Sequence, residues 1–511
     1  MTELERMFEV EPRFVLPDLS TAAPKHGRLI SGPPETSREI YLDAADLRLT
    51  RAGVVLRFIA GDEAPWRLRL PGVPDEMGRP GEQKRAAAAI PADLTALLGV
   101  YARGATPTPV ASVRTTCTRY ELRDGRDGVR AAVVDEVVAV LDGRQTLGRF
   151  RRITVSGNAD RPKAFERVVA TLRSAGAIDH TSAPKHIRAL ASVPRFAELA
   201  GAAADLATPN RPRRRATAAE ALTATLRTDI GAALRADPPA RLDAVDAVHR
   251  MRTAVRRLRS TMRGFAPLFA DSGWAPALAG ELRWLGQALG RARDAEVLRD
   301  RLPSVAALDP AGLLDGASVA RFEAELAARY DDARTGLDEV LSSRRYAVLV
   351  ERLVATAAAP AFEAQAGQRA GLLLPRFVAR SWHHLSDGRH GIDGAADLDA
   401  TRPDQQWHAV RIRARSLRYA VEAVVPVCGA PARAFASALS DLTTVLGAHH
   451  DALLAAAAWL DIAASDPDDH TLAVTAGRLT ERERAAARNA ANNYPAAWRA
   501  VTADHLTAWL P

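Results

Sequence analysis

The 511-residue sequence contains little cysteine, little lysine and no long apolar run. Its two cysteines, Cys117 and Cys428, are too few and too far apart for a disulfide framework or a cysteine-based metal site, which favours a reducing compartment. The first residues are acidic and lack the basic and then apolar pattern of a signal peptide. The most apolar stretch, Ala452 to Leu460, soon meets Asp461. We therefore expect a cytoplasmic protein that has no membrane partner.

The positive charge of the chain is almost entirely arginine. The formal net charge of +8 and the pI near 9.9 favour polyanionic partners. Every basic side chain after residue 185 is Arg or His. A GC-rich genome also tends to encode chains rich in Ala and Arg and poor in Lys. The placement of the arginines, and not their total, therefore has to indicate function. The lysines are Lys25, Lys84, Lys163 and Lys185.

The composition changes along the chain and predicts two domains of different class. Short or alternating apolar runs up to residue 195, with turn signals at Asp124-Gly125 and Asp142-Gly143, are typical of strands. A stretch rich in Ala, Pro and Arg within 196–215 is typical of a linker. Strands are expected at 54–59, 66–70 and 133–138, and a helix at 163–175.

Beyond residue 216, long segments of Ala, Leu, Arg and Glu separated by Pro, Gly and Asp predict an all-α domain. The fold class is therefore α+β, with a β-rich domain at 1–195 and a helical domain at 216–511, whose halves are about 216–357 and 361–511. Helices are expected at 217–236, 242–270, 274–303, 316–341, 345–356, 361–387, 402–426, 430–465 and 472–505.

The helical region contains a duplicated motif, for which an internal repeat is the economical explanation. The first copy has its basic residues at His249, Arg252, Arg256 and Arg259, and the second at His408, Arg411, Arg415 and Arg418. Apolar residues recur with them: Met251, Val255 and Leu258 match Val410, Ala414 and Leu417. A second block follows each copy, with Leu289-Gly290 and Arg293-Asp294 matched by Leu446-Gly447 and His450-Asp451.

The spacing of three, four and three residues puts each basic set on one side of a helix, within an arc of roughly 80°. Arg263 continues the first row, and the apolar set lies on the opposite side. Like charges at these spacings repel one another, so stability alone would not select them. No acidic residue lies between Arg250 and Arg263.

Arginine rows of this kind suit a phosphate polymer. The planar guanidinium donates two hydrogen bonds to one phosphate and stays charged at physiological pH. The row advances about 5 Å per helical turn, so successive side chains can follow a linear polyanion. The alternative is that the arginines pair with acidic residues of neighbouring helices and that His249 and His408 satisfy buried carbonyls. Asp294 and Asp451 are interpreted as residues that orient the rows, without a catalytic role.

The repeated His-x-x-Arg-x-x-x-Arg pattern and the Leu-Gly-x-x-x-Asp block resemble the CHAD family, the conserved histidine α-helical domain, over about 216–511. The resemblance implies two four-helix bundles related by a pseudo-twofold axis, with a basic groove that binds inorganic polyphosphate. The residues that the resemblance implies for this groove are His249, Arg252, Arg256, Arg259, Arg263, Arg293, Arg376, Arg380, His408, Arg411, Arg415 and Arg418.

The N-terminal region resembles the CYTH family, in which antiparallel strands close into a tunnel around a triphosphate and acidic residues hold divalent metal. The family signature begins Glu-x-Glu-x-Lys; Glu3 and Glu5 are present here, but Met7 occupies the lysine position. The late strand that carries further Glu ligands in the family reads 150–156 here, with Arg, Thr and Ser at alternate positions.

A second alignment places the motif at Glu9, Glu11 and Arg13, but Pro12 would then interrupt a central strand. With the first alignment, Glu3 and Glu5 are the remaining metal ligands. We expect a degenerate and inactive tunnel in which Arg57, Arg69 and Arg119 hold phosphate. No cofactor is then required, and Mg²⁺ or Mn²⁺ would matter only if the tunnel were active.

Three functions are compatible with the sequence. The first is non-catalytic binding of inorganic polyphosphate, with polyphosphate granules as an expected location. The second is a metal-dependent triphosphatase or polyphosphatase that uses Glu3 and Glu5. The third is nucleic-acid binding, which the charge allows, although the arginine rows lack the interleaved aromatic residues that stack on single strands. We favour the first, because the metal ligands of the second are incomplete.

Overall fold

The computed structural model describes residues 3–24, 26–80, 89–179, 183–200, 215–270, 273–309, 313–387 and 394–511. The chain divides into two compact units, Met1–Pro209 and Asn210–Pro511.

The N-terminal unit is built on a ten-stranded antiparallel sheet in the order β10-β1-β9-β8-β7-β3-β4-β5-β6, with β2 paired to β7. The strands are β1 (Glu3–Val10), β2 (Arg28–Ser31), β3 (Glu35–Asp43), β4 (Val55–Ala60), β5 (Trp66–Arg69), β6 (Met77–Arg79), β7 (Thr108–Arg123), β8 (Val129–Asp142), β9 (Gln145–Asn158) and β10 (Ile178–Asp179). The strands and turns predicted from the alternating apolar runs are present: Asp124-Gly125 joins β7 to β8, and Asp142-Gly143 joins β8 to β9.

Strand β8 shows how the sheet carries apolar residues on both faces. Ala131 and Val133 are buried in a cluster that includes residues of α3 (Lys163–Ser174). Val138 and Val140, of opposite parity, are buried on the other face with residues of α4 (Lys185–Ala191). The face of the sheet that α4 covers is therefore apolar around Val138 and Val140 and polar elsewhere. The remaining elements of this unit are η1 (Leu19–Ala22), α1 (Arg48–Arg51), α2 (Ala92–Ala102) and η2 (Pro194–Phe196).

Phe196 and Ala200, at the start of the linker expected over 196–215, are buried in a cluster with residues of α4, and the bounds of the linker stay a prediction. The greater part of the expected linker, 201–214, lies outside the described residues. No pairing joins the end strands β6 and β10 within the described part of the sheet, so the closed tunnel stays a prediction.

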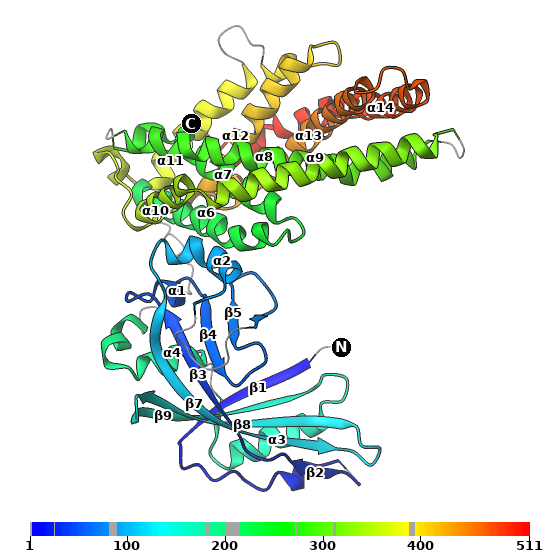
Figure 1. The fold of residues 1–511 in the computed structure, drawn as a ribbon. Coiled ribbons are helices and arrows are strands. Elements are labelled where there is room, and N and C mark those ends of the chain that lie inside the picture. The colour runs from blue at the N-terminus through cyan, green and yellow to red at the C-terminus, as the bar shows by residue number, and fades with distance from the viewer. Residues whose placement is uncertain are drawn as a thin grey trace. The chain divides into compact units, whose positions relative to one another are not determined.

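The C-terminal unit consists of helices, as predicted, and its two halves pack in the same order. In the first half α6 packs on α7, α7 on α8 and α8 on α9; in the second α11 packs on α12, α12 on α13 and α13 on α14. The helices are α6 (Ala218–Arg241), α7 (Ala247–Gly264), α8 (Trp274–Ala306), α9 (Gly316–Ser342), α10 (Arg344–Ala358), α11 (Ala370–Ser386), α12 (Asp404–Cys428), α13 (Ala430–Ala464), α14 (His470–Val501) and α15 (Asp504–Thr507), with η3 (Ala266–Leu268), η4 (Ala364–Gly367) and η5 (Ala395–Asp397) (Figure 1).

The halves meet at equivalent points, as a pseudo-twofold axis requires. The residues that precede α6 and α11 form an antiparallel bridge between Thr217 and Arg369. At this bridge the Ala218 amide donates to the Gln368 carbonyl at 2.8 Å. The equivalent helices α7 and α12 pack against each other. Further along, α8, α9, α13 and α14 share one apolar core that contains Phe322 and Trp459. The duplicated motif therefore lies at the centre of the unit.

Two helices begin later than the sequence pattern predicts. Helix α7 begins at Ala247 and not near residue 242, because Asp243 and Asp246 adopt left-handed backbone conformations with φ of 53° and 57°. Helix α11 begins at Ala370 and not near residue 361, because Phe362 forms an antiparallel bridge with Phe269. In the described part of the chain, no helix has the length and apolar character needed to span a bilayer.

Candidate functional site

The first basic row lies along α7, opposite the buried face of that helix. Met251, Val255 and Leu258 are almost fully buried and hold α7 in the helical unit. Arg252, Arg256 and Arg259 are partly buried, whereas His249 and Arg263, at the two ends of the row, are exposed. The 3-4-3 spacing thus produces the one-sided row that was expected.

The second row lies along α12 in the same way. Val410, Ala414 and Leu417 form its buried face. Arg411, Arg415 and Arg418 are partly buried, and His408 is exposed. Below, "the paired rows" means His249, Arg252, Arg256, Arg259 and Arg263 of α7 together with His408, Arg411, Arg415 and Arg418 of α12.

The packing of α7 on α12 brings the centres of the two rows together. Burial and the positive charges of Arg415, Arg252 and Arg418 lower the pKa of Arg256 to about 10. Burial and the charges of Arg411, Arg252 and Arg418 likewise lower the pKa of Arg415 to about 10. Arginines from different halves of the chain therefore repel one another across the α7–α12 contact. With pKa values of about 10, Arg256 and Arg415 remain charged at neutral pH.

Two aspartates hold one arginine of each row. Nη1 of Arg252 lies 2.7 Å from Oδ1 of Asp294 on α8. At the equivalent place, Nη2 of Arg411 lies 3.6 Å from Oδ1 of Asp451 on α13. These contacts agree with the interpretation that both aspartates orient the rows. They also show that the alternative, pairing with acidic residues of neighbouring helices, applies to this part of each row.

The central arginines are not paired in this way. Within the described ranges, neither Arg256 nor Arg415 makes an ion pair, and Nε of Arg256 is buried without a hydrogen-bond partner. Burying a charge without a partner is costly, so an anion that reached these two guanidinium groups would relieve both desolvation and repulsion. The two unpaired guanidinium groups therefore favour the approach of an anion.

Residues 224–461 match the family profile described as the CHAD domain. The chain contains a CHAD domain. The chain is also 28% identical over 478 residues to uncharacterized proteins from two strains of Mycobacterium tuberculosis, a match that covers 88% of this chain and 87% of each relative.

Two solved structures are similar to parts of the chain. One is PptA from Streptomyces chartreusis, with 22% sequence identity and a TM-score of 0.45, covering 55% of this chain and 99% of that one. The other is the CHAD domain from the plant Ricinus communis, with 23% identity and a TM-score of 0.41, covering 60% of this chain and 95% of that one.

Three histidines of the CHAD domain lie at the ends of the rows. The rings of His408 and His450 have centroids 4.8 Å apart. Burial, Arg411, His408 and Arg415 lower the pKa of His450 to about 4. Burial and neighbouring arginines also lower the pKa values of His249 and His408. Sequence reasoning did not include His450 in the site, although the repeat matched it to Arg293.

The other predicted residues of the CHAD domain are placed differently. Nη1 of Arg293 lies 2.9 Å from Glu296 and 3.5 Å from Asp246, and its charge helps to lower the pKa of His249. Arg376 and Arg380 are exposed on α11, and Arg380 lies over the ring of Phe377. No contact in the described residues links these two to the paired rows, so their place in the site stays a prediction.

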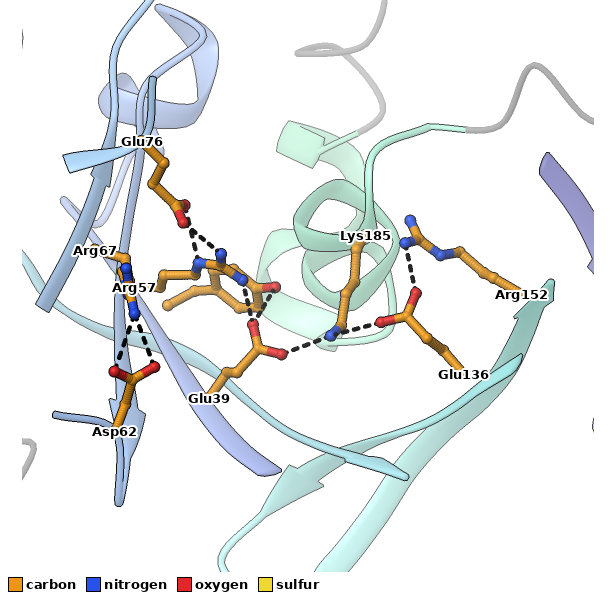
Figure 2. Close-up of polar contacts among 9 residues, drawn as sticks. Glu39, Arg57, Asp62, Arg67, Glu76, Glu136, Arg152 and Lys185 are labelled. Atoms are coloured by element: carbon orange, nitrogen blue, oxygen red, sulfur yellow. Dashed lines mark hydrogen bonds and ion pairs between the residues drawn. The ribbon is translucent and has the colours of Figure 1, made fainter. Parts of the chain in front are cut away.

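The N-terminal unit places the predicted phosphate-binding residue Arg57 in a self-neutralised polar network (Figure 2). Its Nη1 lies 2.8 Å from Oε2 of Glu39, and its Nη2 lies 2.7 Å from Oε2 of Glu76. Lys185, at the start of α4, extends the network with Nζ 2.6 Å from Glu39 and 3.5 Å from Glu136.

This network leaves its carboxylates engaged with cations of the same chain. Glu136 also pairs with Arg152 at 2.8 Å. Although burial alone would raise it, Lys185 and Arg57 keep the pKa of Glu39 below its ordinary value. Lys185 therefore occupies the position between two carboxylates that a metal ion would otherwise suit. Sequence reasoning did not find it, since Lys185 is distant in sequence from both partners.

Of the remaining tunnel predictions, Arg69 lies on the strand next to that of Arg57, whereas Arg119 and Glu5 lie on other strands. Arg69 is exposed on β5, and together with burial and Arg57 it lowers the pKa of His186 to about 4. Arg119 pairs with Glu121 on β7 at 3.1 Å. Glu5 is exposed on β1, while the side chain of Glu3 lies outside what the structure describes. No cluster of three or more potential metal ligands occurs in the described residues.

Proposed function

We propose that the CHAD domain binds inorganic polyphosphate on the paired rows without catalysis. The proposal depends on one observation: Arg256 of α7 and Arg415 of α12 lie close together, are partly buried and have no ion-pair partner among the described residues. A polyphosphate chain carries negative oxygens at regular, closely spaced intervals. It would therefore neutralise several guanidinium groups of both rows together, which a single small anion cannot do.

The N-terminal unit does not support a triphosphatase as the main function. A catalytic tunnel needs carboxylates that are free to bind metal, and Glu39 and Glu136 are instead bound by Lys185, Arg57 and Arg152. We propose that polyphosphate binding requires no cofactor and that the N-terminal unit is a scaffold or a secondary phosphate site. Its resemblance to the CYTH family stays a prediction, as does the association with polyphosphate granules.

The proposal is tested by direct binding and competition. Fluorescently labelled long-chain polyphosphate is titrated with the full chain, and unlabelled polyphosphate or duplex DNA of equal phosphate content is added as competitor. We expect polyphosphate to displace the probe far better than DNA. Replacing Arg256 and Arg415 together by methionine should abolish most of the affinity and reduce its dependence on salt. Equal displacement by DNA, or unchanged affinity of the double variant, would refute the proposal.

The alternative enzyme is tested separately. Phosphate release from tripolyphosphate is measured with Mg²⁺ or Mn²⁺ for the full chain and for the Glu5→Gln variant. We expect no turnover above that of the variant. Robust hydrolysis that is lost with Glu5 would show that the tunnel is catalytic, whatever the CHAD domain binds.

A further inference from the structure

The two rows differ at the position four residues beyond their fourth basic residue. The repeat that matches Arg259 to Arg418 also matches Arg263 to Glu422, which carries the opposite charge. In the second block, Arg283 corresponds to Ser440, and Gly286 to Thr443. The two ends of the site, which a pseudo-twofold axis would make alike, are therefore chemically different.

At the second-half end, Arg418 makes an ion pair, a hydrogen bond and a ring contact within its own chain. Its Nε lies 3.5 Å from Oε1 of Glu422, and its Nη1 donates to the Thr443 hydroxyl at 3.0 Å. The guanidinium also lies over the ring of Tyr419, 4.9 Å from the centroid. Glu422 forms a second ion pair with Arg257. An approaching polyanion would meet a carboxylate at this end, together with an arginine that is already ion-paired, although its Nε has no hydrogen-bond partner.

At the first-half end the cations have no such partners. Arg263 follows Arg259 by one turn of α7, and Arg283 lies one turn before Gly286 of α8, the residue beside which Nη1 of Arg259 lies. Burial and the charges of Arg263 and Arg283 also lower the pKa of Arg259. Arg263 and Arg283 are exposed, and no ion pair of any of the three occurs among the described residues. A methyl group built on Gly286 would lie 3.8 Å from Nη1 of Arg259, so no hydroxyl is available there to take the role of Thr443.

We propose that Arg259, Arg263 and Arg283 form an additional phosphate subsite at this end only. The subsite extends the path of a polyphosphate chain past the central arginines, over the end of α7 and the adjoining part of α8. At the equivalent position of the second row, Glu422 carries a negative charge and is paired with Arg257 and Arg418, so no such subsite forms there. The inference rests on the proposed function, and it adds that the phosphate-binding site is extended at one end only. Polyphosphate is then bound by the central arginines, Arg256 and Arg415, and by this single subsite, which we call the arm.

The subsite predicts a dependence on chain length. Tripolyphosphate is short enough to be bound by the central arginines alone, whereas a long chain also reaches the arm. Arg263→Ala combined with Arg283→Ala should therefore weaken long-chain polyphosphate roughly tenfold, equivalent to about 1.4 kcal/mol, and should weaken tripolyphosphate much less. The slope of log affinity against log salt should fall by about 1 to 2 for the long chain, by analogy with other polyanions.

The matched control removes two exposed arginines of α10 instead, Arg344→Ala with Arg352→Ala, and should leave both affinities nearly unchanged. Glu422→Gln should tighten long-chain binding, because it removes the negative charge at the second-half end. An equal loss for the control and the arm variant, or a loss of tripolyphosphate affinity as large as that of the long chain, would overturn the one-sided arm. If the Arg256 and Arg415 double variant also binds normally, then the proposed function itself fails and not only the arm.

Discussion

Replacing Arg256 by methionine should stabilise the unliganded helical unit while it weakens polyphosphate binding. Burial and three neighbouring guanidinium groups lower the pKa of Arg256 from its ordinary value to about 10. Each pKa unit corresponds to about 1.4 kcal/mol, so holding this charge in the folded state costs at most roughly 3 kcal/mol. Methionine keeps most of the side-chain volume and removes the charge. We expect the free energy of unfolding to rise by about 1 to 3 kcal/mol.

The sign of this effect does not change with pH in the usual range. The folded-state pKa is depressed, so the penalty is fully present below a pH of about 10 and disappears only above the higher pKa of the unfolded chain. The stability difference between the wild type and the variant should therefore be flat from about pH 6 to 9. A difference that varied strongly in this range would point to another titrating group.

Urea unfolding followed by tryptophan fluorescence measures the effect on the correct unit. Of the eight tryptophans, only Trp66 precedes residue 210, so the signal reports mainly on the helices. Arg291→Met, an exposed position on α8, is the matched control and should change stability by less than about 0.5 kcal/mol. With polyphosphate at about 100 times its Kd, the wild type should gain about 2.7 kcal/mol that the variant lacks. Destabilisation of the unliganded Arg256→Met variant would refute the reasoning.

Two further predictions concern titration and the N-terminal unit. Because bound phosphate favours the protonated imidazole, and burial and arginines depress the pKa values of free His408 and His450, binding should take up protons and tighten as the pH falls from 8 to 5.5 at constant ionic strength. Calorimetry in buffers of different ionisation enthalpy checks this, and an affinity that is independent of pH would contradict it. Lys185→Met should leave Glu39 with one cationic partner fewer and cost about 3 to 5 kcal/mol of local stability, seen as faster amide exchange in β3 and β8. The exposed Lys163→Met is its control, and equal exchange in both variants would show that the network is not stabilising.

Local signals were sufficient to predict most elements. The helix expected at 163–175 is α3, and the one expected at 274–303 is α8, because these segments have long apolar periodicity and clear ends. The late start of α7 depends on left-handed aspartates that the residue types alone do not require. The late start of α11 depends on a bridge between segments that are distant in sequence. Tertiary pairing, and not propensity, decides both.

The site was predictable to a similar degree. The one-sided rows follow from residue spacing along a single helix, which the sequence contains directly. The ion pair of Arg418 with Glu422 also lies within one helical turn. The second ion pair of Glu422, with Arg257 from the other half, does not follow from the sequence. Arg283 and His450 belong to neighbouring helices, and their approach to the rows depends on how α8 and α13 pack. Relations of this kind require the packed fold.

The bridge between Thr217 and Arg369 gives the helical unit the geometry of a dimer made from one polypeptide. In a true twofold dimer, every substitution appears on both sides of the axis, so a carboxylate at one end of a symmetric site must also be present at the other. Joining the two copies in one chain removes that constraint. Arg263 and Glu422 occupy equivalent positions with opposite charges, a difference that a symmetric homodimer cannot have. It makes the two ends of a pseudo-symmetric site chemically distinct.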